Sequence, residues 1–82
     1  MIYVTNANYL SEFKVNIKFN DGTEGVVDLK NELAGPIFEP LKDIEYFKKV
    51  TYNEDLDTIC WPNSADFAPE FLYDKIKKHE PA

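Results

Sequence analysis

The chain contains no arginine, a single cysteine, a single histidine and no long apolar run, and each scarcity excludes something. Without arginine, it lacks the planar group that grips phosphates and guanine edges bidentately. Its 9 lysines are outnumbered by 15 carboxylates, and the resulting charge of −6 disfavours nucleic acids and anionic membranes as partners. One cysteine cannot form an internal disulfide, and no apolar run approaches the roughly 20 residues of a membrane span. Because the N-terminal segment has no export signal, we expect a cytoplasmic protein.

What the chain does contain is typical of a folded protein. Apolar residues make up 44% of it, with six Phe, five Tyr and one Trp. This composition lies far from that of disordered chains, whose low hydrophobicity cannot offset the entropy lost on folding. At 82 residues, the chain is long enough for one domain. We therefore expect residues 1–82 to form a single small domain.

Residues 12–19 alternate strictly between polar and apolar side chains, which predicts a half-buried strand. The Asn-Asp-Gly at residues 20–22 then predicts a hairpin. A two-residue loop would place Asp28 opposite Val15 on the apolar face, whereas a three-residue loop ending in a left-handed glycine pairs Val15 with Val27. Because burying a carboxylate is expensive, we predict the second register.

Two further segments complete the predicted sheet. Residues 2–7 can form a short N-terminal strand. Residues 48–61 are typical of a second hairpin that turns at residues 53–56, with Val50 opposite Ile59. The sequence therefore predicts an α+β fold with a mostly antiparallel sheet, built from two hairpins and the N-terminal strand.

A short middle helix and a C-terminal helix are expected to cover this sheet. Pro40 can open the middle helix, on which Leu41, Ile44 and Phe47 fall at helical spacing. Asp66 is the predicted N-cap of the C-terminal helix, because a short acceptor side chain suits that position. Pro69 then falls in the first helical turn, where its missing N–H is harmless.

Few residues could carry chemistry. His79 lies near the C-terminus, where it is expected to complement the negative end of the helix and not to act in catalysis. Cys60 lies in a predicted strand without a neighbouring base, so we expect a passive thiol. The acidic run at residues 53–57 lacks the spacing of a calcium-binding loop and indicates a solvated turn. We therefore expect no catalytic residue, no metal site and no cofactor, and hence no enzyme.

The most distinctive motif is Trp-Pro-Asn-Ser-Ala-Asp, which starts at Trp61 and is followed by Tyr73. One interpretation is a recognition surface in which Trp61 and Tyr73 present flat, amphipathic area beside Pro62, Asn63 and Asp66. The other is a structural corner, in which Trp61 packs under the C-terminal helix while Asn63 and Asp66 satisfy backbone groups. We favour the corner, because every residue then has a geometric role.

These segments, in this order, resemble a known family. The hairpin Phe-Asn-Asp-Gly, the middle segment Gly-Pro-Ile-Phe-Glu-Pro-Leu and the Trp-Pro-Asn motif are similar, over nearly the whole chain, to the small prokaryotic family called domain of unknown function 2442. The matching residues are Phe38, Leu41, Asp43, Phe47, Trp61, Pro62, Asn63, Ala65, Asp66, Pro69, Leu72 and Tyr73. Ser64 stands where the family usually has glycine, so a positive φ there would strain this chain. The resemblance implies a small α+β domain with a mostly antiparallel sheet and without an established enzymatic activity.

The resemblance also implies a class of partner. Family genes often lie beside those of another small uncharacterised family, which suggests toxin–antitoxin-type pairs. Some members carry an added C-terminal helix-turn-helix, which we do not expect in this chain. Together with the charge of −6, this indicates a protein-interaction module, the antitoxin-like half of such a pair, that binds a small basic protein. The contact surface is expected on the outward sheet face around Val26, together with Tyr residues near the edge strand. A free strand edge would also allow a homo-oligomer.

The alternative hypothesis is a small-ligand-binding or enzymatic domain. Its pocket would lie between the C-terminal helix and the turn at residues 61–66, with Asp66 or Cys60 as the polar contact. The clustering of one Trp, one Cys, one Asn and one Asp at residues 60–66 is what suggests it.

Overall fold

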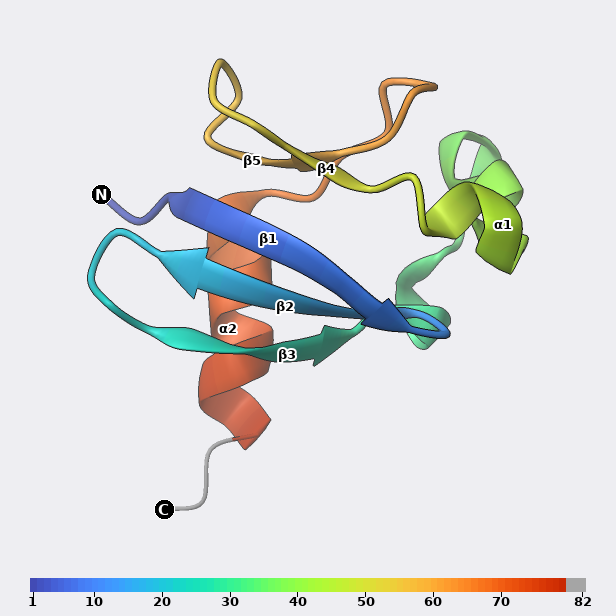
Figure 1. Ribbon diagram of the computed structural model, residues 1–82. Helices are drawn as coiled ribbons and strands as arrows, with labels where there is room; N and C mark the ends of the chain where they lie inside the picture. Colours follow the sequence, from blue (N-terminus) through green and yellow to red (C-terminus); the bar gives the residue numbers. More distant parts are fainter. Residues whose placement is uncertain (80–82) are drawn as a thin grey trace.

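The structure is a computed structural model that describes the backbone of residues 1–79 and the side chains of residues 1–77 (Figure 1). Its elements, in order, are β1 (Val4–Ser11), β2 (Lys14–Phe19), β3 (Glu24–Asp28), η1 (Lys30–Glu32), η2 (Pro36–Lys42), α1 (Ile44–Phe47), β4 (Thr51–Asn53), β5 (Thr58–Cys60) and α2 (Pro69–His79). The elements η1 and η2 are 3₁₀ helices. The predicted α+β class is confirmed.

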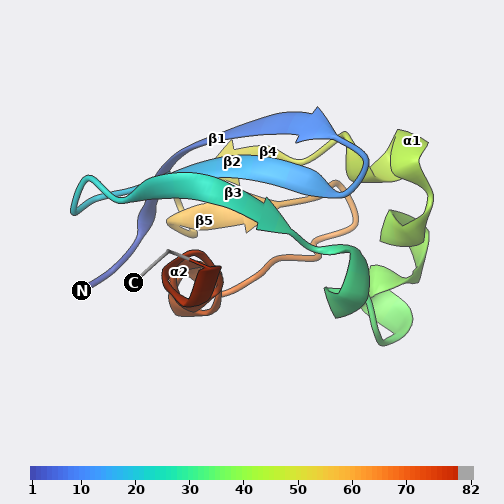
Figure 2. The same ribbon diagram turned by 90° about the horizontal axis from the view of Figure 1, so that it is seen from below.

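The strands form two antiparallel sheets where the sequence suggested one. The first contains β1, β2 and β3 in that order, and the second contains only β4 and β5. Figure 2 shows β5 and α2 beneath the three-stranded sheet, and Figure 1 shows β4 and β5 beside its β1 edge. The second hairpin contacts β1 but forms a separate sheet. Within the described part of the chain, no element covers the opposite face.

The core lies between the three-stranded sheet and the elements beneath it. Its most deeply buried side chains are Val4, Val15, Ile17, Phe19, Val27, Leu29, Leu41, Phe47, Ile59 and Leu72. The helix α2 can approach β3 closely because Gly25 has no side chain. A Cβ at this position would lie only 3.0 Å from Cγ2 of Ile76 on the helix. Burial of these side chains is the main force that holds the two sheets and α2 together.

The first hairpin has the predicted register. Val15 lies opposite Val27, and Gly22 takes the left-handed conformation, with φ of 89°. The N-terminal strand, in contrast, runs over Val4–Ser11 and not over residues 2–7. It is longer because two irregularities in its pairing with β2 absorb the mismatch in register and let the ladder continue to the next turn.

The predicted register of the second hairpin is wrong. Tyr52, and not Val50, lies opposite Ile59. The side-chain oxygen of Asn53 accepts hydrogen bonds from the backbone N–H groups of Asp55 and Leu56, at 2.8 Å and 3.2 Å. Asp57 then takes a left-handed φ of 57°, which returns the chain to β5. The shift is two residues, so each side chain keeps its predicted face.

The middle helical region also begins differently. Pro40 lies inside η2, and the α-helix starts only at Ile44. Asp43 is its N-cap, because its carboxylate accepts the backbone N–H of Glu45 at 3.0 Å. Phe47 is fully buried, as its helical spacing predicted, whereas Ile44 remains 40% exposed.

The C-terminal helix begins at Pro69, two residues later than an N-cap at Asp66 would place it, so Asp66 is not its N-cap. The first helical hydrogen bond runs from the N–H of Leu72 to the carbonyl of Ala68, at 3.2 Å. Asp66 lies two residues before Ala68, where its backbone forms an antiparallel β-bridge with Cys60 of β5. The role expected of the His79 side chain lies outside the described residues.

Candidate functional site

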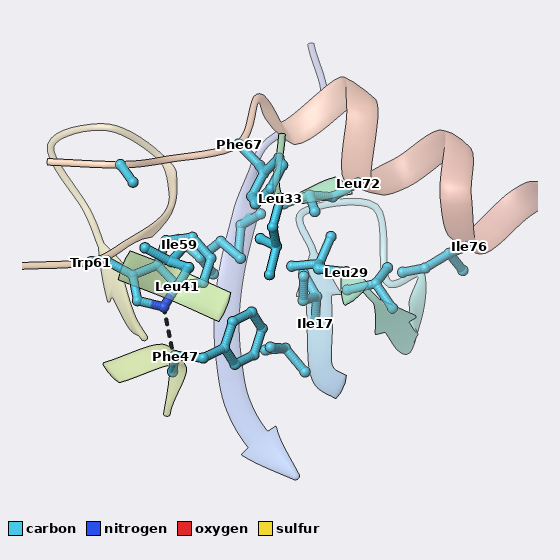
Figure 3. Close-up of a cluster of buried hydrophobic side chains, with 14 of the residues drawn as sticks. Ile17, Leu29, Leu33, Leu41, Phe47, Ile59, Trp61, Phe67, Leu72 and Ile76 are labelled. Carbon is cyan, nitrogen blue, oxygen red and sulfur yellow. Dashed lines mark hydrogen bonds between the residues drawn. The ribbon is translucent and has the colours of Figure 1, made fainter. Parts of the chain in front are cut away.

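Trp61 is a core residue. Its side chain is 2% exposed, and its indole Nε1 donates a hydrogen bond to the carbonyl of Phe47 at 2.8 Å (Figure 3). The indole also contacts the rings of Phe47 and Phe67, with centroids 5.4 Å and 5.8 Å away. A buried tryptophan with its N–H satisfied presents no area to a partner. Trp61 is therefore buried, as the corner interpretation predicted, although its ring contacts come from Phe47 and Phe67 and not from a residue of α2.

Asn63 holds the corner together. Its side-chain oxygen accepts the N–H of Ala65 at 3.1 Å, and its amide donates to the carbonyl of Ile37 in η2 at 2.9 Å. Ser64 between them has φ of 73°, in the left-handed region. The position at which the family usually has glycine thus has a positive φ. Serine adopts this φ here at the cost of backbone strain.

The other motif residues do not gather around Trp61. Pro62 and Asp66 are exposed. Tyr73 donates its hydroxyl to Asp21 Oδ2 at 2.6 Å, so it links α2 to the turn of the first hairpin. This hydrogen bond, helped by a backbone N–H, holds the pKa of Asp21 below its ordinary value of 3.8. The motif is therefore a corner and a separate tether, and not one site.

An acidic surface lies at the tip of the second hairpin. We call Glu54, Asp55, Leu56 and Asp57 the acidic turn; all four are exposed, Leu56 by 49%. Each ion pair among the described residues joins a lysine to a glutamate outside this turn. No ion pair among the described residues therefore neutralises the carboxylates of the acidic turn.

The N-terminal strand borders this turn. Val4 donates its N–H to the carbonyl of Asp57 at 2.9 Å, and neighbouring Tyr3 is 38% exposed. Burial, followed by the charges of Asp57 and Glu54, raises the pKa of Tyr52 at the base of the turn. The sequence indicated a solvated turn here but not a surface. The missed signal is that no lysine occurs between Lys49 and Lys75 to neutralise it.

A hollow of about 210 Å³ lies away from the Trp61 corner. Its lining residues are Glu12, Phe13, Asp28, Lys30 and Ile44. None of them belongs to the segment 61–66, where the alternative hypothesis placed a pocket. Neither Asp66 nor Cys60 contributes to the hollow.

Other kinds of site find no support in the described residues. No group of three or more His, Cys, Asp or Glu side chains there is arranged to hold a metal ion. Among the helices described, none has both the length and the apolar character to cross a membrane.

Comparison with known proteins identifies a family and a fold relative. The family model described as "Protein of unknown function (DUF2442)" matches residues 4–78. No curated protein matches the chain significantly. A solved crystal structure, that of the "Putative DNA Binding Protein NE0471" from Nitrosomonas europaea ATCC 19718, is similar with a TM-score of 0.82 and 22% sequence identity. The match covers 95% of this chain but only 50% of that protein, so this chain spans about half its length. At this identity, the likeness establishes the fold alone.

Proposed function

Because the chain belongs to the DUF2442 family of proteins of unknown function, we propose its role from its own surface: it is a protein-interaction module that binds a basic protein through the acidic turn. Within a toxin–antitoxin-type pair, it would be the acidic, neutralising half. The observation that carries this proposal is the juxtaposition of unneutralised carboxylates with exposed Leu56 and Tyr3.

Each part of this surface has a physical role in association. The carboxylates of Glu54, Asp55 and Asp57 attract a basic partner over a Debye length, about 10 Å at 0.1 M salt, and raise the rate of encounter. Leu56 and Tyr3 supply the apolar contact that slows dissociation once the complex has formed. Complex formation should therefore weaken steeply as salt rises.

A tagged pull-down from the native organism at low salt tests this proposal. We expect one small basic protein near one-to-one stoichiometry, identified by mass spectrometry and native mass. The double variant Glu54→Gln/Asp55→Asn should lose it. The matched control Glu70→Gln/Asp74→Asn removes the same two charges from α2 and should retain it.

A partner lost equally from both double variants would indicate only a net-charge effect and contradict a site at the acidic turn. The variant Val26→Thr addresses the other surface, because Val26 is 50% exposed on the open sheet face opposite Asn16. Loss of the partner from Val26→Thr alone would indicate that the contact lies on the open sheet face and not at the acidic turn. An empty column would contradict the proposal as a whole.

The fold relative's name raises DNA binding as a second candidate function. That name belongs to a protein of which this chain matches only 50%. Against DNA binding by this domain stand the charge of −6 and the absence of arginine. In an electrophoretic mobility shift at moderate salt we expect no retarded band, and a retarded band would revive DNA binding.

A further inference from the structure

The hollow lined by Glu12, Phe13, Asp28, Lys30 and Ile44 is independent of the acidic turn. It lies where the turn between β1 and β2, the end of β3 and the start of α1 come together, at the end of the sheet opposite the turn between β2 and β3 (Figure 1). Its volume of about 210 Å³ is below the ~300 Å³ at which sites for drug-sized ligands begin. Only a ligand of few atoms would fit it.

Internal hydrogen bonds hold the backbone of the walls. The carbonyl of Glu12 accepts the hydroxyl of Tyr9 at 3.0 Å, and the carbonyl of Phe13 accepts the N–H of Leu29 at 2.9 Å. The N–H of Lys30 donates to Asp28 Oδ1 at 3.0 Å.

The apolar wall is also fixed. The Phe13 ring meets Phe47 edge to face, with centroids 5.1 Å apart. Ile44 is the first residue of α1, where the Asp43 cap anchors it. The hollow is therefore largely preformed, which lowers the entropy that a ligand must overcome.

The lining combines charged and apolar residues. Acidic Glu12 and Asp28 and basic Lys30 line the same hollow as the apolar residues Phe13 and Ile44. Lys14 lies 3.8 Å from the Glu12 carboxylate at the rim. Among the described residues, the Lys30 ammonium forms no ion pair, so it is available to an anionic group.

We infer that this hollow binds a free α-amino acid with an apolar side chain. The ammonium group of the ligand faces the carboxylates of Glu12 and Asp28, and its carboxylate faces Lys30. Its side chain lies against Phe13 and Ile44, where it covers apolar surface that is now wet. A chain terminus of a protein would offer only one of the two charges and would leave the other side of the hollow unmatched.

Titration of ¹⁵N-labelled full chain with leucine, followed by amide chemical shifts, tests this inference. We expect saturable shifts confined to residues that line the hollow, with a dissociation constant on the order of 1 mM. N-acetyl-leucine lacks the ammonium charge and leucinamide lacks the carboxylate, so each should bind roughly tenfold more weakly.

Lys30→Gln should weaken leucine binding by a similar factor, whereas the matched control Lys18→Gln, an exposed lysine on the open sheet face, should not. The same spectra report whether each variant is folded. Absence of saturable shifts, shifts spread beyond the hollow, or equal binding of N-acetyl-leucine or leucinamide would each overturn the inference. These results do not depend on the partner test, because none of the variants touches the acidic turn.

Discussion

At the scale of single residues, the backbone angle of Ser64 is the feature with the clearest energetic consequence. A residue with a Cβ loses about 1–2 kcal/mol in the left-handed region, and Ser64 has φ of 73°. Among the described residues, no side-chain hydrogen bond of Ser64 offsets this loss; its backbone N–H donates to the carbonyl of Trp61 at 3.0 Å. The corner therefore carries strain that the family's glycine would not.

Ser64→Gly should raise the free energy of unfolding by about 0.5–1 kcal/mol, because relief of strain exceeds the extra freedom that glycine has in the unfolded chain. Gly22→Ala is the opposite control: it puts a Cβ at φ of 89° and should destabilise. Urea unfolding followed by fluorescence of Trp61, the single tryptophan, measures both. A Ser64→Gly variant of unchanged or lower stability would contradict the strain.

At this scale, the sequence predicts a residue's type of role better than its partner. The corner role of Asn63 follows from the turn chemistry of asparagine, yet its bond to Ile37 joins residues far apart in the chain. Trp61 was expected inside, but its acceptor, the carbonyl of Phe47, depends on where α1 ends. Such contacts depend on tertiary packing, which local patterns do not encode.

At the scale of elements, one tether joins α2 to the first hairpin. Tyr73 packs its ring edge to face on Phe19, with centroids 5.1 Å apart, while its hydroxyl binds Asp21. The bond lowers the pKa of Asp21 in the folded state, so its stabilisation is present above pH ~4 and is lost as pH falls through the folded-state pKa.

Tyr73→Phe keeps the ring and removes the hydroxyl, so it tests this tether alone. We expect a lower melting temperature than the parent at pH 7 and a difference that vanishes in acid, below the folded pKa of Asp21. The pKa of Asp21, followed by NMR, should rise toward 3.8. Tyr46→Phe is the control, because the Tyr46 hydroxyl has no hydrogen-bond partner among the described residues. A pH-independent loss of stability would point to packing instead.

The two hairpins differ in how well the pattern of apolar and polar residues predicts their register. The first hairpin followed from the sequence because the wrong register would bury carboxylates, a large and local penalty. The second did not, because a slip of two residues keeps every side chain on its face and costs little, leaving Asn53 and the left-handed Asp57 to decide. The start of α2 was displaced because the backbone of Asp66 serves the bridge to β5.

At the scale of the whole molecule, the distribution of charge matters more than its sum. The sequence predicts a net charge of −6 but not which carboxylates are neutralised. Glu32 and Lys75 form an ion pair at 3.1 Å, with side chains only 30% and 21% exposed, which joins η1 to α2. Glu54, in contrast, adds to the unneutralised field of the acidic turn. Removing a single negative charge should therefore have opposite effects at these two positions.

Glu32→Gln should lower the free energy of unfolding by up to ~1 kcal/mol, because it leaves the partly buried Lys75 without its partner. Glu54→Gln should raise it by a few tenths of a kcal/mol, because it relieves repulsion within the turn and with the rest of a negative molecule. Both variants have the same net charge, so net charge alone would give them the same sign. Thermal unfolding at ~0.01 M and ~0.3 M salt distinguishes the loss of the ion pair from the relief of repulsion. Salt screens the exposed acidic turn more than the partly buried ion pair. If both variants were stabilised equally at low salt, the field would be uniform, and the acidic turn would have no electrostatic advantage as a docking surface.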